Sequence, residues 1–471
     1  MSAANQTSKH VAIIGSGSAS FAAALKLAEL GARVTMVENA DVIGGTCVNI
    51  GCVPSKIMIR AALLAHQQSL TSIKGIKPRA PVVDRELMVQ QQQSIVVELR
   101  HAKYENILLN TPAVNLIKGY ARFINNKTLL VSRSDGTSIK IEADQYLLAV
   151  GARANIPAIA GLADTPFWTS TEALVATRVP DHLVVLGGSV VALELAQAFR
   201  RLGAKVTLMA RSRLLSSKDV DLGEGLKTAL EDEGMIIHLN TVPSDIRHDG
   251  KQFRLSIAGG EVLCDQLLVA TGRRSNADTL ALDNTTVKIS ETGAIIVDKF
   301  MRTSAEHIYA AGDCCNQPQY VYVAAAAGTR AARTIMGDKT ALDLSAMPAV
   351  VFTDPQLATV GLDLAMAQSR GISVVSKTLT LDNVPRAIAN LNTRGFIRLV
   401  AETDTGRILG CQVLAQEAGE IIQTAALAIG NQMTITMLAD MLFPYLTMVE
   451  GLKLCAQSFS KDVSKFSCCA G

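Results

Sequence analysis

The stretch that decides the fold is HVAIIGSGSASFAAALKLAELGARVTMVE, residues 10–38. An apolar run leads into a glycine turn, a segment rich in small residues follows, and Leu-Gly-Ala introduces a second apolar run that ends at Glu38. This order predicts a strand, a tight turn, a helix and a parallel strand, the opening βαβ unit of a dinucleotide-binding fold. A second copy, HLVVLGGSVVALELAQAFRRLGAKVTLMAR, spans residues 182–211. The chain therefore predicts two nucleotide-binding units.

The first turn carries Gly15-x-Gly17-x-x-Ser20, with serine in place of a third glycine. Gly15 permits the tight turn, and Gly17 lets backbone N–H groups approach a pyrophosphate at the positive end of the helix. Glu38 stands where a carboxylate accepts hydrogen bonds from a ribose diol. We expect a bound dinucleotide here rather than a purely structural turn.

The second turn has Gly187, Ser189 and Ala192 at the three glycine positions of the pattern. Serine is the smallest substitution that a close backbone approach could accept. The turn still favours a second nucleotide site.

The end of the second unit indicates which nucleotide it binds. Arg211 follows the strand where the first unit has Glu38, and Arg213 and Lys218 are nearby. A carboxylate there would repel a 2′-phosphate, whereas a guanidinium pairs with it in two-pronged geometry. We therefore expect this site to prefer NADPH to NADH, with a solvated basic loop as the alternative.

Two cysteines follow directly after the first unit, in IGGTCVNIGCVPSKIMIRAA, residues 43–62. Cys47 and Cys52, hereafter the redox pair, lie in a glycine-rich turn that becomes a helix, and their spacing allows the sulfurs to bond and to separate again. A thiol held near a helix N-terminus has a lowered pKa. We interpret the pair as a redox-active disulfide rather than a static structural one.

Composition excludes some partners. The 471 residues are 49% hydrophobic and 18% charged, which excludes a disordered chain, and the net charge of +3 comes without a basic run of the kind that binds nucleic acid. The sequence has no charge-free apolar run of about 18 residues. The polar start, MSAANQTSKH, lacks a signal-peptide pattern. We expect a cytoplasmic protein with no nucleic-acid partner and no membrane span.

The order of these patterns predicts an α/β protein in which the second nucleotide-binding domain interrupts the first. Short strands are expected between Asn276 and Asp313, followed by a helix over 323–336. The first domain is predicted in two pieces, residues 1–151 and 276–346. The inserted second domain is predicted over residues 152–275, and a C-terminal α+β domain with a Cys-Cys tail over residues 347–471.

GGTCVNIGCVPSK resembles the active-site signature of the FAD-dependent pyridine nucleotide–disulfide oxidoreductases, and the resemblance extends through essentially the whole chain. ATGR at 270–273, YAAGD at 309–313 and FTDP at 352–355 match further motifs of this family. AVG at 149–151, where the pattern is usually ATG, is a mild departure. The resemblance implies an FAD-binding domain, an NADPH-binding domain and a dimerisation domain, in a homodimer with shared active sites.

The resemblance also implies roles for individual residues. Lys56 and Glu194 form an ion pair beside the flavin, where hydride arrives, and Asp313 holds the ribityl chain. The residues expected to contact the two cofactors are Gly15, Gly17, Ser20, Glu38, Gly45, Thr46, Lys56, Gly151, Asp313, Gly187, Ser189, Ala192, Glu194, Arg211, Arg213 and Gly272.

Two departures from the disulfide reductases indicate which member of the family this is. Their His-Pro-Thr-x-x-Glu motif, whose histidine serves as acid and base, is replaced by a segment that begins with Tyr445. Tyrosine, with an ordinary pKa of about 10, is poorly suited to moving protons at neutral pH. The tail, SKDVSKFSCCAG, carries adjacent Cys468 and Cys469, hereafter the tail pair, and thiolates select soft metal ions.

These features, with Tyr104 and the stretch FPYLTMVEGLKL at 443–454, closely resemble the mercuric reductases of the family. The resemblance implies that the tail pair of one subunit captures thiol-bound Hg(II) and passes it to the redox pair of the other. Tyr104 and Tyr445 line the metal site, where electrons from NADPH reduce the ion to Hg(0). We expect a catalytic core without the N-terminal metal-binding domain that many of these enzymes carry, so that delivery would rely on the tail pair.

Other interpretations stay open. A large thioredoxin reductase also relays electrons through a C-terminal cysteine pair, although its relay needs the missing histidine. A dihydrolipoamide dehydrogenase is disfavoured by Arg211 as well, and a binder that only sequesters thiophilic metal would not oxidise NADPH steadily. Cys314 and Cys315, directly after Asp313, are interpreted as buried packing, with a second metal site as the alternative.

Overall fold

Unbroken apolar runs form the parallel strands at the centre of the first domain. The computed structural model describes residues 8–70 and 73–462. The strands of this sheet are parallel, and residues 11–14 of its central strand are buried, as expected for a strand covered on both faces. In spatial order they are β17 (Ile308–Ala310), β7 (Gln145–Leu148), β1 (His10–Ile14), β2 (Arg33–Glu38) and β3 (Val114–Lys118).

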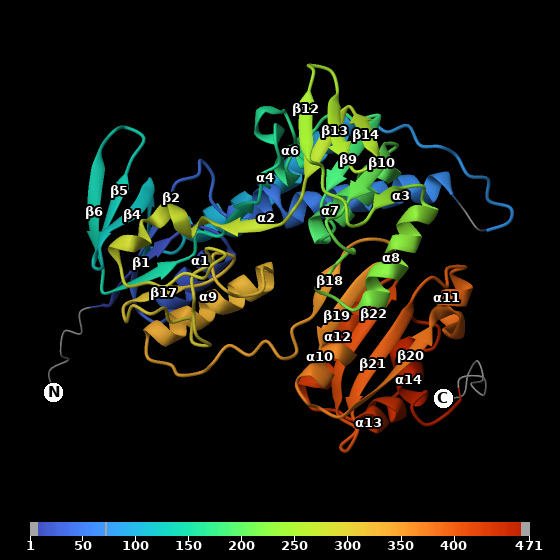
Figure 1. Cartoon of the computed structure of the whole chain (residues 1–471). Coiled ribbons are helices and arrows are strands. Elements are labelled where there is room, and N and C mark those ends of the chain that lie inside the picture. Colours follow the sequence, from blue (N-terminus) through green and yellow to red (C-terminus); the bar gives the residue numbers. More distant parts are fainter. Residues whose placement is uncertain (1–7, 71–72, 463–471) are drawn as a thin grey trace.

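Two helices pack together in the first domain, α1 (Ser18–Glu29) and α9 (Val321–Ile335) (Figure 1). Their contact is close because Gly328 lacks a side chain: a Cβ there would lie 2.1 Å from the carbonyl oxygen of Ala19. A small antiparallel sheet completes the domain, made of β4 (Tyr120–Asn125), β5 (Thr128–Ser132) and β6 (Ser138–Glu142).

The short strands predicted between Asn276 and Asp313 are mostly wrong. This segment forms two 3₁₀ turns, isolated bridges and the short strand β17. Its backbone is held by bonds to side chains of other segments, such as the bond from the Thr286 N–H to Asn126 Oδ1 at 3.0 Å. Local alternation of apolar residues could not distinguish such anchored loops from strands.

The second domain repeats the parallel pattern. Its sheet has the order β11 (Ile236–His238), β10 (Lys205–Met209), β9 (His182–Leu186) and β15 (Gln266–Val269). Its helices are α6 (Ser170–Val175), α7 (Val190–Arg201) and α8 (Val220–Asp232), and an antiparallel sheet is formed by β12 (Asp245–His248), β13 (Phe253–Ile257) and β14 (Gly260–Cys264). The chain passes between the first and second domains through the antiparallel pair β8 (Ala152–Ala154) and β16 (Arg273–Ser275).

The C-terminal domain is built on an antiparallel sheet (Figure 1). Its order is β18 (Ala349–Val351), β19 (Gln356–Gly361), β22 (Ile408–Ala415), β21 (Phe396–Glu402) and β20 (Val374–Thr380). Its helices are α10 (Leu364–Ser369), α11 (Pro385–Ala389), α12 (Ala418–Gly430), α13 (Ile435–Asp440) and α14 (Glu450–Gln457). The predicted α/β fold with a C-terminal α+β domain is confirmed.

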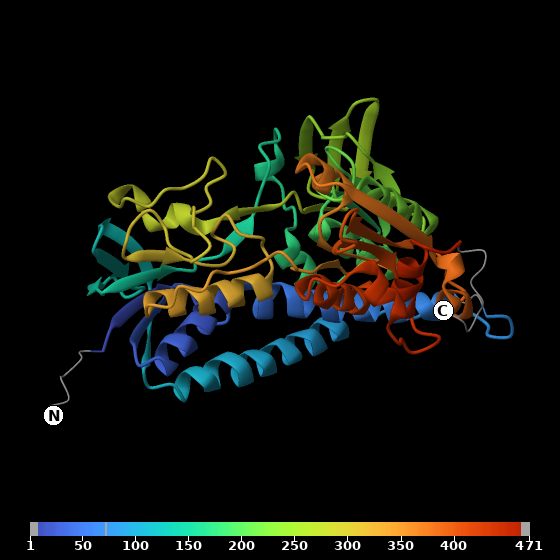
Figure 2. The same ribbon diagram turned by 90° about the horizontal axis from the view of Figure 1, so that it is seen from below.

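A long helical arm connects the first domain to the others, and Figure 2 shows it running beneath them. It consists of α2 (Gly45–Ile50), α3 (Cys52–Ser69), α4 (Arg85–Arg100), a π-helical turn (His101–Glu105) and α5 (Asn106–Leu109). Met58 and Ala62 of α3 are buried in a core shared with α7. The stretch Gly45–Ser69 is long and apolar enough to cross a membrane by length and composition, a test that core helices also pass.

Candidate active site

The first glycine turn is shaped by two close backbone approaches. Gly15 has φ +107°, and a Cβ there would lie 2.4 Å from the carbonyl oxygen of Ala149. A Cβ on Gly45 would lie 2.6 Å from the Cα of Gly17. The absence of side chains therefore leaves the N-terminus of α1 open and seats the start of α2 directly against it.

The second turn has the same geometry. Gly187 has φ +134°, and a Cβ there would lie 2.2 Å from the carbonyl oxygen of Ala270. Ser189 is exposed and precedes α7, whose Ala192 is fully buried against the sheet. The turns at Gly15 and Gly187 thus each leave an open space at the N-terminus of a helix, α1 and α7; we call these spaces the first and second cradles.

The two cradles differ at the end of the second strand. Glu38 is 8% exposed; its Oε2 accepts a hydrogen bond from Ser16 Oγ at 2.6 Å, and its Oε1 accepts one from the Ala40 N–H at 2.7 Å. These contacts fix the carboxylate beside the first turn, where a ribose diol could donate to it.

Arg211 occupies the corresponding place in the second unit and is exposed. Arg213, in contrast, donates to the carbonyl oxygens of Ser216 and Lys218 at 2.7 and 2.8 Å. Its guanidinium therefore stabilises the loop that precedes α8. Lys218 extends toward the C-terminal domain, where its Nζ lies 3.4 Å from Thr359 Oγ1. Of the three basic residues noted in the sequence, Arg211 alone is exposed and has no partner among the described residues.

The redox pair lies where α2 meets α3. Gly51 separates the two helices, and a Cβ there would lie 2.9 Å from the carbonyl oxygen of Thr46. This sharp junction places Cys52 at the first position of α3, with Cys47 one helix earlier, and both are free thiols. Cys52 is exposed, so the pair can be reached from outside the chain.

The two thiols have different acidities. A hydrogen bond from the Cys47 thiol lowers the pKa of Cys52 to about 7, and the positive charge of Lys56 also lowers it. The same hydrogen bond raises the pKa of Cys47, because Cys47 keeps its proton as the donor. Cys52 is therefore the more acidic thiol of the pair and the one that more readily forms a thiolate.

Lys56 and Glu194 form the ion pair that the family resemblance predicted. Lys56 Nζ lies 2.6 Å from Glu194 Oε2, and the carboxylate is 5% exposed. Glu194 Oε1 accepts a hydrogen bond from the backbone N–H of Phe352 at 2.9 Å, and Lys56 Nζ lies 4.5 Å from the centroid of the Phe352 ring. Residues of three domains therefore contact one another at this ion pair. Phe352 is a residue of the site that the sequence did not predict.

Tyr104 lies beside the redox pair. The π-helical turn presents its ring to Phe21, with the centroids 4.8 Å apart and the planes at 83°. Burial raises the pKa of Tyr104, and its hydroxyl is hydrogen-bonded to Ser18. The phenol is therefore neutral at physiological pH and can act as a hydrogen-bond donor.

Several buried polar groups near the first turn fit a bound FAD. Ser20 is fully buried, and its Oγ has no hydrogen-bond partner among the described residues. The Nε atom of Arg273 also has no hydrogen-bond partner among them, although its side chain as a whole is 23% exposed. Asp313 lies 3.8 Å from that guanidinium, and burial raises the pKa of its carboxyl. Unsatisfied groups of this kind require a polar partner, which a dinucleotide would supply. Gly151 and Gly272, at φ +67° and +116°, have open space where a Cβ would be.

Other predicted site residues lie apart or outside the described part of the chain. Tyr445 is half exposed in the loop before α14 of the C-terminal domain. Cys468 and Cys469 lie outside the described residues. In the described ranges, no cluster of three or more His, Cys, Asp or Glu could hold a metal ion.

Cys314 and Cys315 match the packing interpretation. They are 0% and 3% exposed, belong to the core of the first domain, and have sulfurs 3.8 Å apart. Sγ of Cys314 also contacts the carbonyl oxygens of Leu148 and Ala311.

Comparison with known proteins gives a consistent family. Residues 9–328 match the model of the pyridine nucleotide–disulphide oxidoreductases, and residues 347–456 match the dimerisation domain of the same family. The chain is 56% identical to the mercuric reductase of Shewanella putrefaciens over 467 residues, covering 99% of this chain and 84% of the relative. It is 41% identical to the mercuric reductase of Streptomyces lividans, covering 99% of each chain.

Solved structures agree with this fold. The HOCl-induced flavoprotein disulfide reductase RclA from Escherichia coli, solved as a Cu(II) complex, superposes with a TM-score of 0.87 at 30% identity, covering 97% of this chain and all of that one. LpdA from Mycobacterium tuberculosis superposes with a TM-score of 0.87 at 26% identity, covering 96% of this chain and all of that one.

Proposed function

Because this chain belongs to the pyridine nucleotide–disulphide oxidoreductase family, we propose that it is an NADPH-dependent mercuric reductase that converts thiol-bound Hg(II) to Hg(0). The observation that carries the proposal is the dithiol Cys47–Cys52, whose more acidic member, Cys52, is exposed, beside the Lys56–Glu194 pair. A thiolate pair is the ligand set that a soft two-coordinate ion prefers. Tyr445 stands where a disulfide reductase needs a histidine.

FAD is the cofactor that the first cradle would hold, through the turn at Gly15 and Gly17, the carboxylate of Glu38, and Asp313. When bound, FAD supplies two-electron redox chemistry between the nicotinamide and the redox pair. NADPH would occupy the second cradle, with Arg211 directed at the 2′-phosphate.

The Lys56–Glu194 ion pair is proposed to lie on the side of the site where the nicotinamide would bind. Glu194 is buried and holds Lys56 in place, while Phe352 fixes the other carboxylate oxygen. The fixed ammonium also favours the thiolate of Cys52. The positive charge of Lys56 thus acts both on Glu194, where hydride is expected to arrive, and on the thiolate of Cys52.

The redox pair receives the metal by ligand exchange. The Cys52 thiolate attacks Hg(SR)2 and displaces one RS⁻, and the Cys47 thiol then displaces the second and gives up its proton, so that two protein Hg–S bonds replace two others and one RS⁻ and one RSH are released. Tyr104 is a neutral donor beside both sulfurs. The overall reaction balances as NADPH + H⁺ + Hg(SR)2 giving NADP⁺, Hg(0) and two RSH.

The tail pair is proposed to deliver the ion. Adjacent thiols near the chain end can capture Hg(II) and transfer it to the partner's redox pair without releasing it, with Tyr445 lining the shared site. The match to the family's dimerisation domain supports a homodimer. We infer a cytoplasmic enzyme, because both cysteine pairs must be kept reduced, without nucleic-acid or membrane partners.

The test is steady-state oxidation of NADPH by HgCl2 in excess thiol. Wild type should show sustained turnover and release mercury vapour, whereas a Cys468→Ala/Cys469→Ala variant should lose most of this activity when Hg(II) is tightly thiol-bound. Oxidation of NADPH by ferricyanide, which needs no metal, is the control and should be equal in both proteins. A flavin-loaded enzyme that ignores Hg(II) but reduces thioredoxin would instead support the thioredoxin reductase interpretation.

A further inference from the structure

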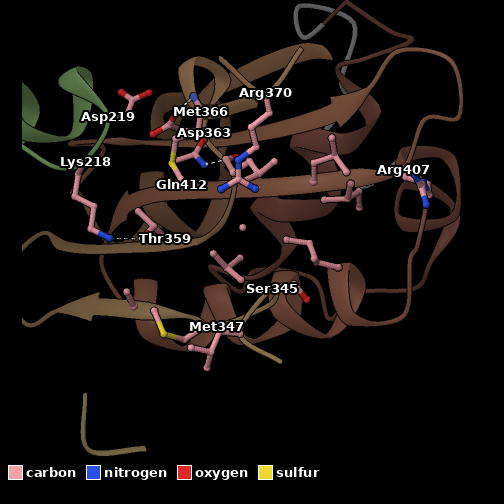
Figure 3. Close-up of a pocket in the computed structure, with 18 of the residues that line it drawn as sticks. Lys218, Asp219, Ser345, Met347, Thr359, Asp363, Met366, Arg370, Arg407 and Gln412 are labelled. Carbon is pink, nitrogen blue, oxygen red and sulfur yellow. Dashed lines mark hydrogen bonds between the residues drawn. The ribbon is translucent and has the colours of Figure 1, made fainter. Parts of the chain in front are cut away.

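A cavity of about 490 Å³ lies away from the redox pair, between the second domain and the C-terminal domain. Figure 3 shows Lys218 entering it from the loop before α8, and Arg370 reaching in from the end of α10 toward Gln412 of β22. Leu344, Met347, Ile408 and other apolar side chains form part of the wall. Its volume is in the range of pockets that hold small organic ligands.

Gln412 is an unsatisfied polar group in this wall. Its side chain is 2% exposed, and its Nε2 donates to the carbonyl oxygen of Leu362 at 3.2 Å. That bond fixes the orientation of the amide, and within the described residues Oε1 has no hydrogen-bond partner. A buried acceptor without a donor is costly, so the cavity calls for a molecule that carries an O–H or N–H group.

Two cations in the cavity form no ion pair with any residue that the structure describes. Lys218 has a single long contact with Thr359, and burial lowers its pKa, which an anion would counteract. Arg370 forms no side-chain hydrogen bond or ion pair among the residues that the structure describes.

The remaining charged groups of the wall are already engaged. Asp219 pairs with Arg398 at 2.9 Å, and Arg407 pairs with Glu402 at 3.0 Å. Asp363, which partly balances Lys218, accepts the Met366 N–H at the start of α10. The positive charges of Lys218 and Arg370 are therefore the ones available to a ligand.

We propose that this cavity is a second ligand site, for a small phosphate ester that also carries a hydroxyl group. Lys218 and Arg370 would bind the phosphate, for which a guanidinium is geometrically suited. The hydroxyl would donate to Gln412 Oε1, and the apolar wall would accommodate the carbon skeleton. The site bridges two domains and is independent of the proposed metal chemistry.

Isothermal titration calorimetry of the FAD-loaded dimer with ribose 5-phosphate tests the proposal. We expect saturable binding of one ligand per chain, with ribose not bound and inorganic phosphate bound more weakly. Lys218→Met should raise the Kd at least about tenfold, because a charge-assisted contact is lost. Lys218→Arg should restore binding, and Lys227→Met, which removes a lysine from α8 outside the cavity, should bind as wild type does.

Gln412→Met removes the orphaned acceptor while keeping the side-chain length, and should weaken the ester more than inorganic phosphate. Unchanged affinity in the Lys218→Met and Gln412→Met variants would overturn the site. Loss of binding in Arg211→Ser instead would place the phosphate in the nucleotide cradle and overturn the proposal equally. Inorganic phosphate bound as tightly as the ester would overturn the assignment to an ester.

Discussion

Lys56 Nζ lies 2.6 Å from Glu194 Oε2, and this contact joins α3, the helix that begins with Cys52, to α7 of the second domain. Glu194 is the buried partner, at 5% exposure against 35% for Lys56. Since the backbone N–H of Phe352 binds the other oxygen, the carboxylate cannot turn away from the ammonium without losing a second bond.

We expect Glu194→Gln to slow reduction of the flavin by NADPH about 10- to 100-fold, because a charge-assisted hydrogen bond contributes about 1.5–3 kcal/mol. Stopped-flow absorbance of the holoenzyme measures this step directly. Glu291→Gln, on an exposed turn, is the matched control and should react as wild type does. An unchanged rate in the Glu194 variant would show that the pair is only structural.

Alkylation of Cys52 should follow its lowered pKa. The rate with iodoacetamide is expected to rise as the pH increases through about 7, because the thiolate is the reactive form. Cys47→Ala removes the principal hydrogen bond to Cys52 and should move the midpoint to higher pH, whereas Cys47→Ser keeps a donor and should move it less. Mass spectrometry of the labelled peptide separates Cys52 from the other thiols, and an identical midpoint in Cys47→Ala would contradict the assignment.

Tyr104→Phe should lower the Hg(II)-dependent kcat about 10- to 100-fold, because it removes a neutral donor worth about 1.5–3 kcal/mol toward a charged acceptor while keeping the ring against Phe21. Flavin reduction by NADPH should be unaffected. Tyr120→Phe, at a site 64% exposed, controls for the loss of a hydroxyl. Equal kcat values for the Tyr104 variant and wild type would remove the tyrosine from the metal step.

Arg211→Ser should raise the KM for NADPH about 10- to 100-fold and leave the KM for NADH nearly unchanged, because the guanidinium recognises only the 2′-phosphate. Steady-state assays with both nucleotides measure the ratio. Arg247→Ser, which removes a guanidinium 77% exposed, is the control. A parallel rise for NADPH and NADH would indicate damage to the loop rather than lost phosphate recognition.

Gly45→Ala should produce a protein depleted of FAD, because the added Cβ would lie 2.6 Å from the Cα of Gly17 and the residue has φ +66°. Gly136→Ala is the matched control, since that glycine also has a positive φ, +82°, but open space around it. The ratio of flavin to protein absorbance after purification measures the effect. Full flavin content in the Gly45 variant would mean that α2 can shift away from the turn.

What could be predicted from sequence depended on short-range spacing. The glycine turns, the acidic residue at 38 and the redox pair each lie within a few residues of the elements that position them. The bond between Glu194 and Phe352 joins residues 158 positions apart and depends on how three domains pack. The directions of Arg213 and Lys218 were likewise set by a loop whose path the basic residues did not reveal.

The likeness of the two nucleotide units reaches beyond their glycines. His10 Nε2 lies 2.9 Å from Thr35 Oγ1 in the first unit, and His182 Nε2 lies 2.9 Å from Thr207 Oγ1 in the second. In each unit this bond joins the first strand to the second, β1 to β2 and β9 to β10. Because the two scaffolds are bonded alike and differ at the strand end, with Glu38 in one and Arg211 in the other, the preference for a coenzyme can change there without any change of the scaffold.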